Sequence, residues 1–267
     1  MTECDVILDI DSVHEGDCIE LLRHLPDGCA QLIIADPPYN LGPKFGVATE
    51  WVKDPNWLNW CGEWLTECRR VLADDGNLFV YGIHHYLCLL HVRLYEMGMS
   101  YRRQVIWFYE NGFTTHRRNL ATHYEPLLWF SKNPDSYFRE IREPYKSTDR
   151  LRHKIIKNGK EWTPHPDGRL AGDVWSFPTL AGRRFRDEKV NHPTQKPLAL
   201  TDRIVNHFSE PGTLVVVPFA GSGTECVSAL RNGRNYWAAE IKHEYVQLAR
   251  RRLRTAMAAP MLPIESE

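Results

Sequence analysis

The sequence predicts an α/β fold in which a mostly parallel sheet is covered by helices on both faces. Residues 32–35 and 214–217 are continuous apolar runs, each too short for a helix and each followed by a proline-containing turn, as expected of buried parallel strands. Between them, Leu58, Leu65 and Leu72 recur at helical spacing. Strands that alternate with helices along a chain favour parallel pairing, because the crossover helices then cover both faces of the sheet.

The individual elements follow from the same patterns. We expect strands at residues 32–35, 77–81, 103–109, 127–130, 214–217 and 236–239, and helices at 58–72, 84–97, 198–208 and 225–232. The turn Asp74-Asp75-Gly76 is predicted to end the first helix, and Pro197 to open the third. Residues 133–190 combine weak periodicity with many prolines, glycines and charges. We interpret them as an insertion within one domain of residues 1–267.

Composition excludes several classes of protein. A chain of 267 residues is long enough to bury a full core, and its net charge is -1. No apolar run approaches the roughly 18 residues that cross a membrane, and the N-terminus lacks the pattern of a secretory signal. The seven cysteines are scattered and form no Cys-x-x-Cys pair, so neither disulfides nor a zinc site is indicated. We therefore expect a cytoplasmic protein without a membrane partner.

The segment Asp36-Pro37-Pro38-Tyr39 directly follows the first buried strand. In open α/β sheets, ligands bind at the carboxyl ends of the strands, so this is where binding residues are expected. The prolines remove two backbone donors, while the carboxylate and a carbonyl can accept both hydrogens of an exocyclic amine. Tyr39 offers a face on which a planar base can stack. The alternative interpretation is an ordinary turn in which Tyr39 only packs.

A second turn follows the strand at 214–217. It reads Pro218-Phe219-Ala220-Gly221-Ser222-Gly223-Thr224 and leads into a helix. Glycines let the backbone approach a ligand closely, and the N–H groups at a helix start bind polar atoms. Glu240, 17 positions after Gly223, ends the next strand, where a carboxylate can hold ribose hydroxyls.

Two phosphate-binding motifs do not fit this turn. A P-loop would require a Gly-Lys-Ser/Thr sequence, which is absent, and a dinucleotide fingerprint would require glycine at position 226, where the chain has Cys226. A ligand that contains a nucleoside but no pyrophosphate fits better, and S-adenosyl-L-methionine is such a ligand.

Taken together, these motifs resemble those of the β-class DNA amino-methyltransferases, in which the amine-binding motif precedes the cofactor motif. Here the two motifs are about 180 residues apart in that order. The segment 192–197, His-Pro-Thr-Gln-Lys-Pro, is similar to the family segment before the cofactor strand. The segment 15–18, Glu-Gly-Asp-Cys, is similar to its acidic turn near the cofactor adenine. The four matches extend from about residue 13 to 254.

The resemblance implies a fold, a cofactor and site residues. The fold would be the Rossmann-like methyltransferase fold with an inserted target-recognition region, and the cofactor S-adenosyl-L-methionine. The catalytic residues would be Asp36, Pro37, Pro38 and Tyr39. The cofactor-binding residues would be Asp17, Cys18, Asp36, His192, Thr194, Lys196, Phe219, Ala220, Gly221, Ser222, Gly223, Thr224 and Glu240. No metal is implied. Dimers are common in the family, so a homodimer is a further expectation.

One position departs from the family pattern. The family has an acidic residue immediately before the Pro-Phe of the cofactor motif, and this chain has Val217. The acidic side chain is expected near the cofactor, so its loss bears on cofactor affinity and on activity.

Basic residues gather inside the predicted insertion. Residues 139–160 hold eight Lys or Arg against three acidic residues. Because such clusters suit phosphate contacts, and because the family carries its target-recognition region here, we expect duplex DNA as the partner. The alternative is a solvated surface. The candidate DNA-binding residues are Arg117, Arg118, Arg150, Arg152, Lys154, Lys157, Arg183, Arg184 and Arg186.

The expected reaction is direct methyl transfer to the N6 amine of an adenine flipped out of duplex DNA. Transfer to the N4 amine of cytosine stays open, because the same acceptors fit it; aspartate at position 36 favours adenine within the family. RNA or protein-glutamine methylation fits the motif order less well. Cytosine C5 methylation is disfavoured, since no cysteine follows a proline. A DNA-binding protein that has lost turnover, with Val217 as the reason, is the remaining alternative.

Overall fold

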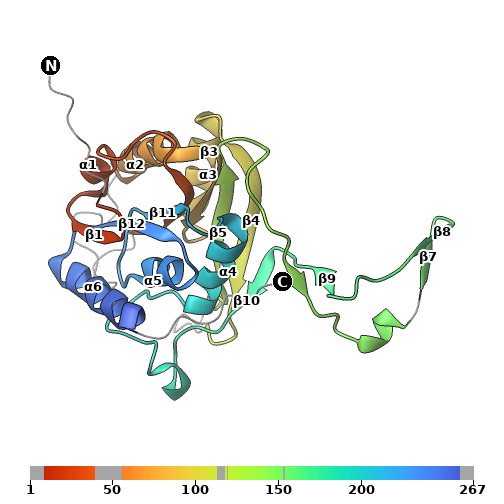
Figure 1. Cartoon of the computed structure of the whole chain (residues 1–267). Coiled ribbons are helices and arrows are strands. Elements are labelled where there is room, and N and C mark those ends of the chain that lie inside the picture. Colours follow the sequence, from red (N-terminus) through yellow and green to blue (C-terminus); the bar gives the residue numbers. More distant parts are fainter. Residues whose placement is uncertain (1–8, 40–55, 113–117, 119, 153, 259–267) are drawn as a thin grey trace.

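The computed structural model describes residues 9–39, 56–112, 118, 120–152 and 154–258, without the side chains of residues 148, 150, 155, 157 and 162. Its centre is an eight-stranded sheet with the order β1-β12-β11-β2-β3-β5-β4-β10 (Figure 1). All neighbouring strands are parallel except β5, which runs antiparallel to β3 and β4. The strands are β1 (Ser12–Glu15), β2 (Ala30–Ala35), β3 (Leu72–Tyr81), β4 (Ser100–Phe108), β5 (Tyr124–Ser131), β10 (Val174–Ser176), β11 (Leu214–Val217) and β12 (Asn235–Glu240).

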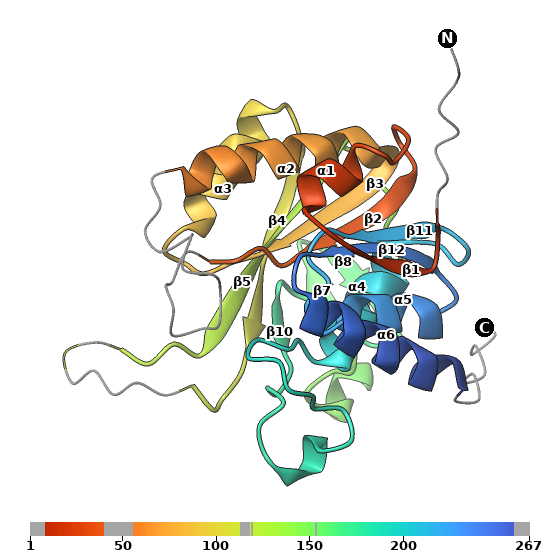
Figure 2. The ribbon, with the colours of Figure 1, turned by 90° about the vertical axis from the view of Figure 1, so that its left-hand side faces the viewer.

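Helices cover both faces of this sheet (Figure 2). One face packs against α1 (Cys18–Leu22), α2 (Trp57–Val71) and α3 (Leu87–Glu96), and the other against α4 (Leu198–Phe208), α5 (Thr224–Arg231) and α6 (His243–Ala258). From Leu32 to Ala35, successive β2 residues alternate between the two apolar cores, which is why all four are buried. The predicted mostly parallel α/β fold is confirmed.

The junction between α2 and β3 differs from the sequence prediction. The helix ends at Val71, and Leu72 is already extended and paired with Ala30. Pairing then resumes between Leu32 and Asn77, so the predicted turn Asp74-Asp75-Gly76 lies within an irregularity of β3. The side chain of Gln31 donates to Asp75 Oδ2 at 2.8 Å, which ties this irregularity to β2. Residues Asp74-Asp75-Gly76 interrupt the regular pairing, but β3 already begins to pair with β2 before them, at Leu72.

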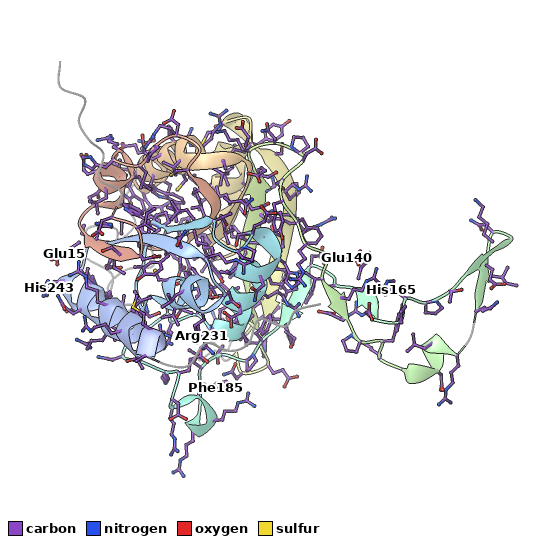
Figure 3. All side chains as sticks on the ribbon, viewed as in Figure 1. Glu15, Glu140, His165, Phe185, Arg231 and His243 are labelled. Carbon is purple, nitrogen blue, oxygen red and sulfur yellow. The ribbon has the colours of Figure 1, made fainter. Side chains whose placement is uncertain are left out.

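Two further segments stand out from the body. The first is an arm built from β6 (Arg142–Glu143), the 3-10 helix η3 (Thr148–Leu151), β7 (Ile155–Lys157), β8 (Lys160–Trp162) and β9 (Arg169–Leu170), which extends to the right in Figure 1. The second is a loop that carries the 3-10 helix η4 (Arg183–Phe185) below the body. Figure 3 places the labelled Glu140 and His165 at the root of the arm and Phe185 on the separate loop.

The arm is attached to the body at its base. Glu143 of β6 forms ion pairs with Arg169 of β9 at 2.7 Å and with Arg203 of α4 at 3.0 Å. After β9 the chain returns to the sheet, where β10 pairs parallel with β4. The predicted insertion, residues 133–190, therefore contains both the projecting arm and one strand of the main sheet.

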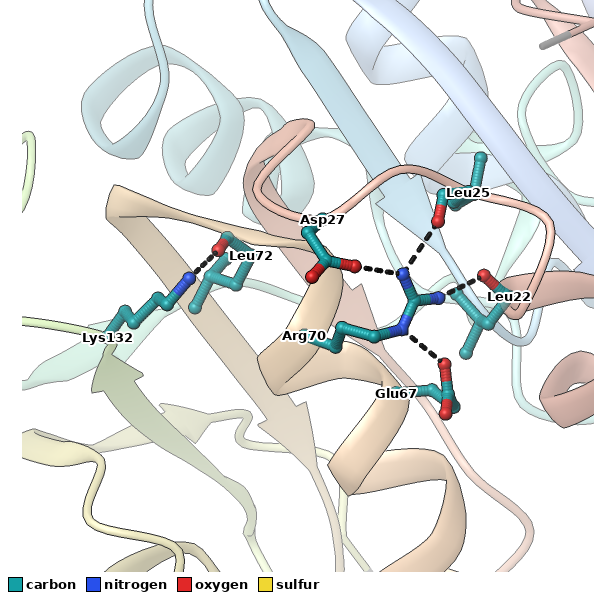
Figure 4. Close-up of polar contacts among 7 residues, drawn as sticks. All are labelled: Leu22, Leu25, Asp27, Glu67, Arg70, Leu72 and Lys132. Carbon is teal, nitrogen blue, oxygen red and sulfur yellow. Dashed lines mark hydrogen bonds and ion pairs between the residues drawn. The ribbon is translucent and has the colours of Figure 1, made fainter. Parts of the chain in front are cut away.

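Arg70 ties α2 to the connection between α1 and β2 (Figure 4). Its guanidinium donates to the carbonyl oxygens of Leu22 and Leu25, both at 2.8 Å, and pairs with Asp27 and Glu67. Leu22 is the last residue of α1 and Leu25 lies just beyond it; the Leu22 carbonyl also accepts from the N–H of Leu25 at 2.9 Å, so Arg70 is its second donor. The arginine thus adds a donor to each carbonyl and holds the chain that leads into β2.

No helix in the described ranges is both long and apolar enough to cross a membrane. Among the same residues, no group of three or more His, Cys, Asp or Glu side chains gathers as a metal site would require.

Candidate active site

The sequence-predicted motifs meet at one edge of the sheet. The strands β1, β12, β11 and β2 are adjacent and parallel, so their carboxyl ends lie side by side. Asp36 follows β2, Pro218 follows β11, and Glu240 ends β12 opposite Glu15 of β1. The backbone N–H of Gly16 donates to the Glu240 carbonyl at 3.0 Å, which brings the acidic turn at 15–18 beside Glu240. Segments far apart in the chain thus form one site.

Lys196 and three acidic groups form a cluster at this edge. Lys196 Nζ lies 3.1 Å from Asp36 Oδ2 and 2.6 Å from Glu125 Oε1, and its side chain is 3% exposed. The hydroxyl oxygen of Tyr39 lies 2.7 Å from Glu125 Oε1 and is also hydrogen-bonded to Asp36 Oδ1. Lys196 Nζ donates to the same hydroxyl at 3.2 Å. We call Asp36, Tyr39, Glu125 and Lys196 the acid–lysine cluster.

Burial and charge shift the pKa values within the cluster. Burial alone would lower the pKa of Lys196, but the carboxylates of Asp36 and Glu125 outweigh it and raise that pKa above its usual value. Burial raises the pKa of Glu125; Lys196 opposes this shift, and the charge of Asp36 adds to it. The pKa of Tyr39 is well above its usual value, because the group is buried beside two carboxylates. Lys196 is therefore cationic and Tyr39 a neutral phenol.

The cluster changes how two residues are interpreted. Lys196 was predicted to bind the cofactor, and the structure places its ammonium against Asp36 of the amine-binding motif. Glu125 was not singled out from the sequence at all. It is the second residue of β5, and a charged residue at the start of an otherwise apolar strand was the signal that pointed to it.

The carbonyl groups of the two prolines differ in whether they already accept a hydrogen bond. Trp57 Nε1 donates to the carbonyl oxygen of Pro38 at 2.9 Å, so this acceptor is engaged by the start of α2. Within the described part of the chain, the Pro37 carbonyl has no hydrogen-bond partner. Asp36 and the Pro37 carbonyl are thus the acceptors that this turn can offer to an amine.

The glycine turn forms a cradle beside the cluster. Gly221 has φ +48° and Gly223 φ +74°, both in the left-handed region that favours glycine. A Cβ on Gly221 would lie 3.0 Å from Nε2 of His192, and a Cβ on Gly223 2.7 Å from that of Ala249. The turn can therefore lie against His192 and α6 only because both residues lack side chains.

His192 closes one side of this cradle as a neutral ring. Burial lowers its pKa to about 4, and its buried Nδ1 has no hydrogen-bond partner within the described residues. The ring packs edge-on against Tyr245, with centroids 4.5 Å apart. A buried, unpartnered ring nitrogen beside a glycine cradle fits a polar group of a bound ligand.

The other predicted cofactor residues are divided between the cradle and its support. Glu240 Oε2 accepts from the backbone N–H of Gly221 at 2.8 Å, and each carboxylate oxygen retains capacity for a further donor. Asp17 caps α1 by accepting from Ile19 N at 2.8 Å. Cys18 is buried in the core at the start of that helix, and Ala220 is also buried.

The remaining members of the motif are held by packing and by α6. The hydroxyls of Ser222 and Thr224 are 3.0 Å apart, and Arg252 donates to the Ser222 carbonyl at 2.7 Å. Phe219 packs edge-on against the core residue Trp64. Thr194 is exposed on the segment before α4.

Val217, the departure from the family pattern, is 1% exposed and belongs to the apolar core beneath α4, α5 and α6. A different carboxyl is buried on the helix that follows the glycine turn. Glu225, in the first turn of α5, is 4% exposed, and its pKa is raised to about 7 by burial and by the charge of Asp36.

The predicted DNA-binding residues lie on separate surface segments. Arg152 and Lys154 are exposed on the arm, where they pair with Asp149 at 3.4 Å and Glu161 at 2.5 Å. Arg183, Arg184 and Arg186 are exposed on the loop with η4, and Arg118 is exposed on the connection between β4 and β5. Arg117 and the side chains of Arg150 and Lys157 lie outside the described residues.

Comparison with known proteins identifies the family. Residues 30–251 match the model of the DNA methylase family of N6 and N4 methyltransferases. The type II methyltransferase M1.MboII of Moraxella bovis is 32% identical over 255 residues, covering 91% of this chain and 96% of that protein. The DNA adenine methyltransferase YhdJ of Escherichia coli (strain K12) is 31% identical over 249 residues, covering 92% and 83%.

Solved structures share the fold at lower identity. The M1.HpyAVI–SAM complex has a TM-score of 0.60 and 22% identity, covering 90% of this chain and 98% of that one. The cytosine-N4-specific PvuII DNA methyltransferase has a TM-score of 0.67 and 18% identity, covering 92% and 89%. The resemblance noted from the motifs is thereby confirmed. Because the family model spans most of the chain and relatives above 30% identity match nearly all of it, the protein belongs to the N6/N4 DNA methylase family and is a DNA methyltransferase.

Proposed function

We propose that the protein transfers a methyl group from S-adenosylmethionine to the exocyclic N6 amine of adenine in duplex DNA. The observation that carries the proposal is the pair of acceptors at the end of β2, the Asp36 carboxylate and the Pro37 carbonyl, which no described residue engages. Its similarity to YhdJ, an adenine methyltransferase, supports adenine as the substrate. Aspartate at position 36 supports the same choice.

The residues of the cradle fit a nucleoside-containing cofactor. Gly221 and Gly223 allow close backbone approach, and Glu240 offers carboxylate oxygens to ribose hydroxyls. Nδ1 of His192, which has no hydrogen-bond partner among the described residues, offers one further polar contact. When bound, S-adenosylmethionine supplies the methyl group, and its sulfur retains the electron pair of the broken bond.

The chain's own contribution to the reaction is positioning and electrostatics. Asp36 and the Pro37 carbonyl accept the two N–H bonds of a flipped-out amine, which orients the nitrogen lone pair. Positive charge that grows on the nitrogen during transfer is stabilised by the Asp36 carboxylate. Lys196 holds that carboxylate in place, since it contacts Oδ2 from a buried position. Tyr39 lies next to the acceptors and supplies a ring for the base to stack on.

Duplex DNA would contact the exposed basic residues of the arm and of the loop with η4. Both segments project from the body, and Arg152, Lys154 and Arg184 are exposed on them. Their charges suit phosphate contacts, which position a duplex without reading its sequence.

The test is incubation of the purified protein with unmethylated mixed-sequence duplex DNA and radiolabelled S-adenosylmethionine, followed by nucleoside analysis. We expect label in the N6-methylated adenine nucleoside; label in the N4-methylated cytosine nucleoside would replace adenine by cytosine as substrate. No label from the natural chain, with label restored by Val217→Asp, would identify a DNA-binding protein with an impaired cofactor site. No label from either protein would overturn DNA methylation by this chain.

Asp36→Ala tests the amine-binding role directly. Methylation should fall by roughly 100-fold or more, the size seen when a preorganised group that stabilises developing charge is removed. Because the cradle does not depend on Asp36, the thermal shift caused by S-adenosylmethionine should be retained. Unchanged methylation would exclude Asp36 from the reaction.

A further inference from the structure

Glu125 is a largely buried carboxyl group to which the proposed mechanism assigns no role. It lies at the start of β5, and its Oε1 contacts both Lys196 Nζ at 2.6 Å and the Tyr39 hydroxyl oxygen at 2.7 Å. It has no direct contact with Asp36. Instead, the hydroxyl of Tyr39 stands between the two carboxyl groups and is hydrogen-bonded to both. The three side chains thus form a continuous line, Asp36 to Tyr39 to Glu125.

The contacts let a proton pass along this line. The hydroxyl of Tyr39 can donate its hydrogen to Glu125 while its oxygen accepts one from Asp36. Lys196 contacts both carboxyl groups and the same hydroxyl, so it holds the three side chains in place.

The surroundings favour Glu125 as the end of the line that holds a transferred proton. Burial raises its pKa, and the charge of Asp36 raises it further, against the opposing effect of Lys196. One ammonium cannot compensate two carboxylates that are each only 18% exposed, so one of them gains by being neutral. Among the described residues, the other titratable side chains that interact with Glu125 are Tyr81 of β3 and Tyr109 beyond β4, both phenols whose pKa values are raised by burial. Neither brings a second positive charge.

The proposed methylation must release a proton. A primary amine that gains a methyl group passes through a cationic nitrogen and becomes neutral only when an N–H bond breaks. We propose that Glu125 is the final acceptor of this proton, which passes from the amine to Asp36 and through the Tyr39 hydroxyl to Glu125. The inference rests on the proposed function and adds to it the group that receives the proton.

The steps balance as follows. The amine nitrogen forms its bond to the methyl carbon with its lone pair, while the electrons of the methyl–sulfur bond stay on sulfur. The N–H bond then breaks with its electrons remaining on nitrogen, and the proton binds Asp36 Oδ1. Asp36 passes a proton to the Tyr39 oxygen as the Tyr39 hydroxyl proton moves to Glu125. The result is a carboxylic acid at Glu125, a carboxylate at Asp36 and an unchanged phenol.

Two single substitutions each interrupt the line of three side chains at a different residue and leave Asp36 in place. Glu125→Gln keeps the shape and a hydrogen-bonding group but cannot take a proton, and Tyr39→Phe keeps the ring but removes the hydroxyl bridge. The methyl-transfer rate, measured in a single turnover, should fall in each by roughly 100-fold, the lower range of a general-base contribution. The double variant should lose no more than either single variant, because both act on one path. Glu96→Gln, at the exposed end of α3, should retain the wild-type rate.

The pH profile separates proton transfer from mere support of the structure. The wild-type rate should rise with pH through a pKa above the usual glutamate range, as Glu125 becomes able to accept. This rise should be absent from both single variants. Glu125→Asp, which restores an acid, should recover the rise in part. Additive losses in the double variant, or an unchanged rise in Glu125→Gln, would overturn the proposal.

A second readout needs neither DNA nor activity. In the cofactor-free protein, infrared spectroscopy across a pH range should show a carboxyl group that titrates with a pKa above the usual glutamate range; this titration should be absent from Glu125→Gln and present in Glu96→Gln. Retention of the titration in Glu125→Gln would overturn the assignment of Glu125 as the acceptor. Failure of the wild-type protein to methylate any base would instead refute the proposed function, and the infrared result would still report on the titration of Glu125.

Discussion

The ammonium of Lys196 lies 3.1 Å from Oδ2 of Asp36, although one residue precedes α4 and the other follows β2. The lysine also contacts Glu125, so a single buried cation serves two carboxyl groups. Losing one partner of such a buried set costs far more than losing a surface ion pair, because the remaining charges cannot be solvated. This relationship sets the first prediction.

Lys196→Met should destabilise the protein by about 3–5 kcal/mol, the range for breaking a buried ion pair, and should abolish methylation. Stability would be measured by urea unfolding at neutral pH. Lys189→Met, which removes an exposed lysine from the preceding segment, should change stability by less than about 0.5 kcal/mol. The raised pKa of Lys196 means that its contribution is complete at neutral pH and disappears only as alkaline pH passes that raised value. Equal stability of the two variants would contradict this role.

Glu225 should make stability depend on pH. Its pKa is raised from 4.5 to about 7 in the folded protein, so between these values the native state binds a proton that the unfolded state has lost. Stability should therefore fall as pH rises from 4.5 to about 7 and stay level above it, by up to about 3 kcal/mol. In Glu225→Gln this fall should vanish. Urea unfolding across the range checks it, with Glu96→Gln as the control; an identical fall in Glu225→Gln would rule out this group as the source.

The arm should contribute to DNA affinity through charge. Replacing Arg152 and Lys154 by alanine removes two exposed cations from it. If both contact phosphates, the slope of log affinity against log salt concentration should become shallower by about 2. Fluorescence anisotropy with duplex DNA at several salt concentrations measures this slope. Arg231→Ala, at the exposed end of α5, serves as the control (Figure 3). If the slope stays at its wild-type value, the arm does not contact the DNA backbone.

Arg70 should matter more for stability than its partial exposure indicates. Arg70→Met removes the side-chain donor of the Leu25 carbonyl and one of the two donors of the Leu22 carbonyl, at a cost of about 2 kcal/mol. Arg23→Met, which removes only an exposed helical ion pair, should cost less than about 1 kcal/mol. Thermal or urea unfolding compares the two. A similar small effect for both would mean that water replaces the guanidinium without loss.

Much of the fold could be predicted from local patterns. The strand at 214–217 and the helix at 198–208 have the predicted bounds, because an apolar run between turn residues and an opening proline are local signals. The observed bounds of a strand differ from the predicted ones where pairing with a neighbouring strand sets them. β5 was predicted at 127–130 but begins at Tyr124, since β4 pairs with it along its whole length.

The sequence by itself determined the α/β fold class, the order of the motifs and the turn that offers Asp36 and Pro37. Only the tertiary structure decided what surrounds Asp36. Because β5 runs antiparallel, its first residues lie at the sheet edge where its neighbours end, and this places Glu125 at the site. The sequence predicted the strand but not its direction. If β5 ran parallel to its neighbours, Glu125 would lie at the opposite edge of the sheet. The contact between Lys196, Asp36 and Glu125 joins three distant segments, so it exists only once the sheet has formed.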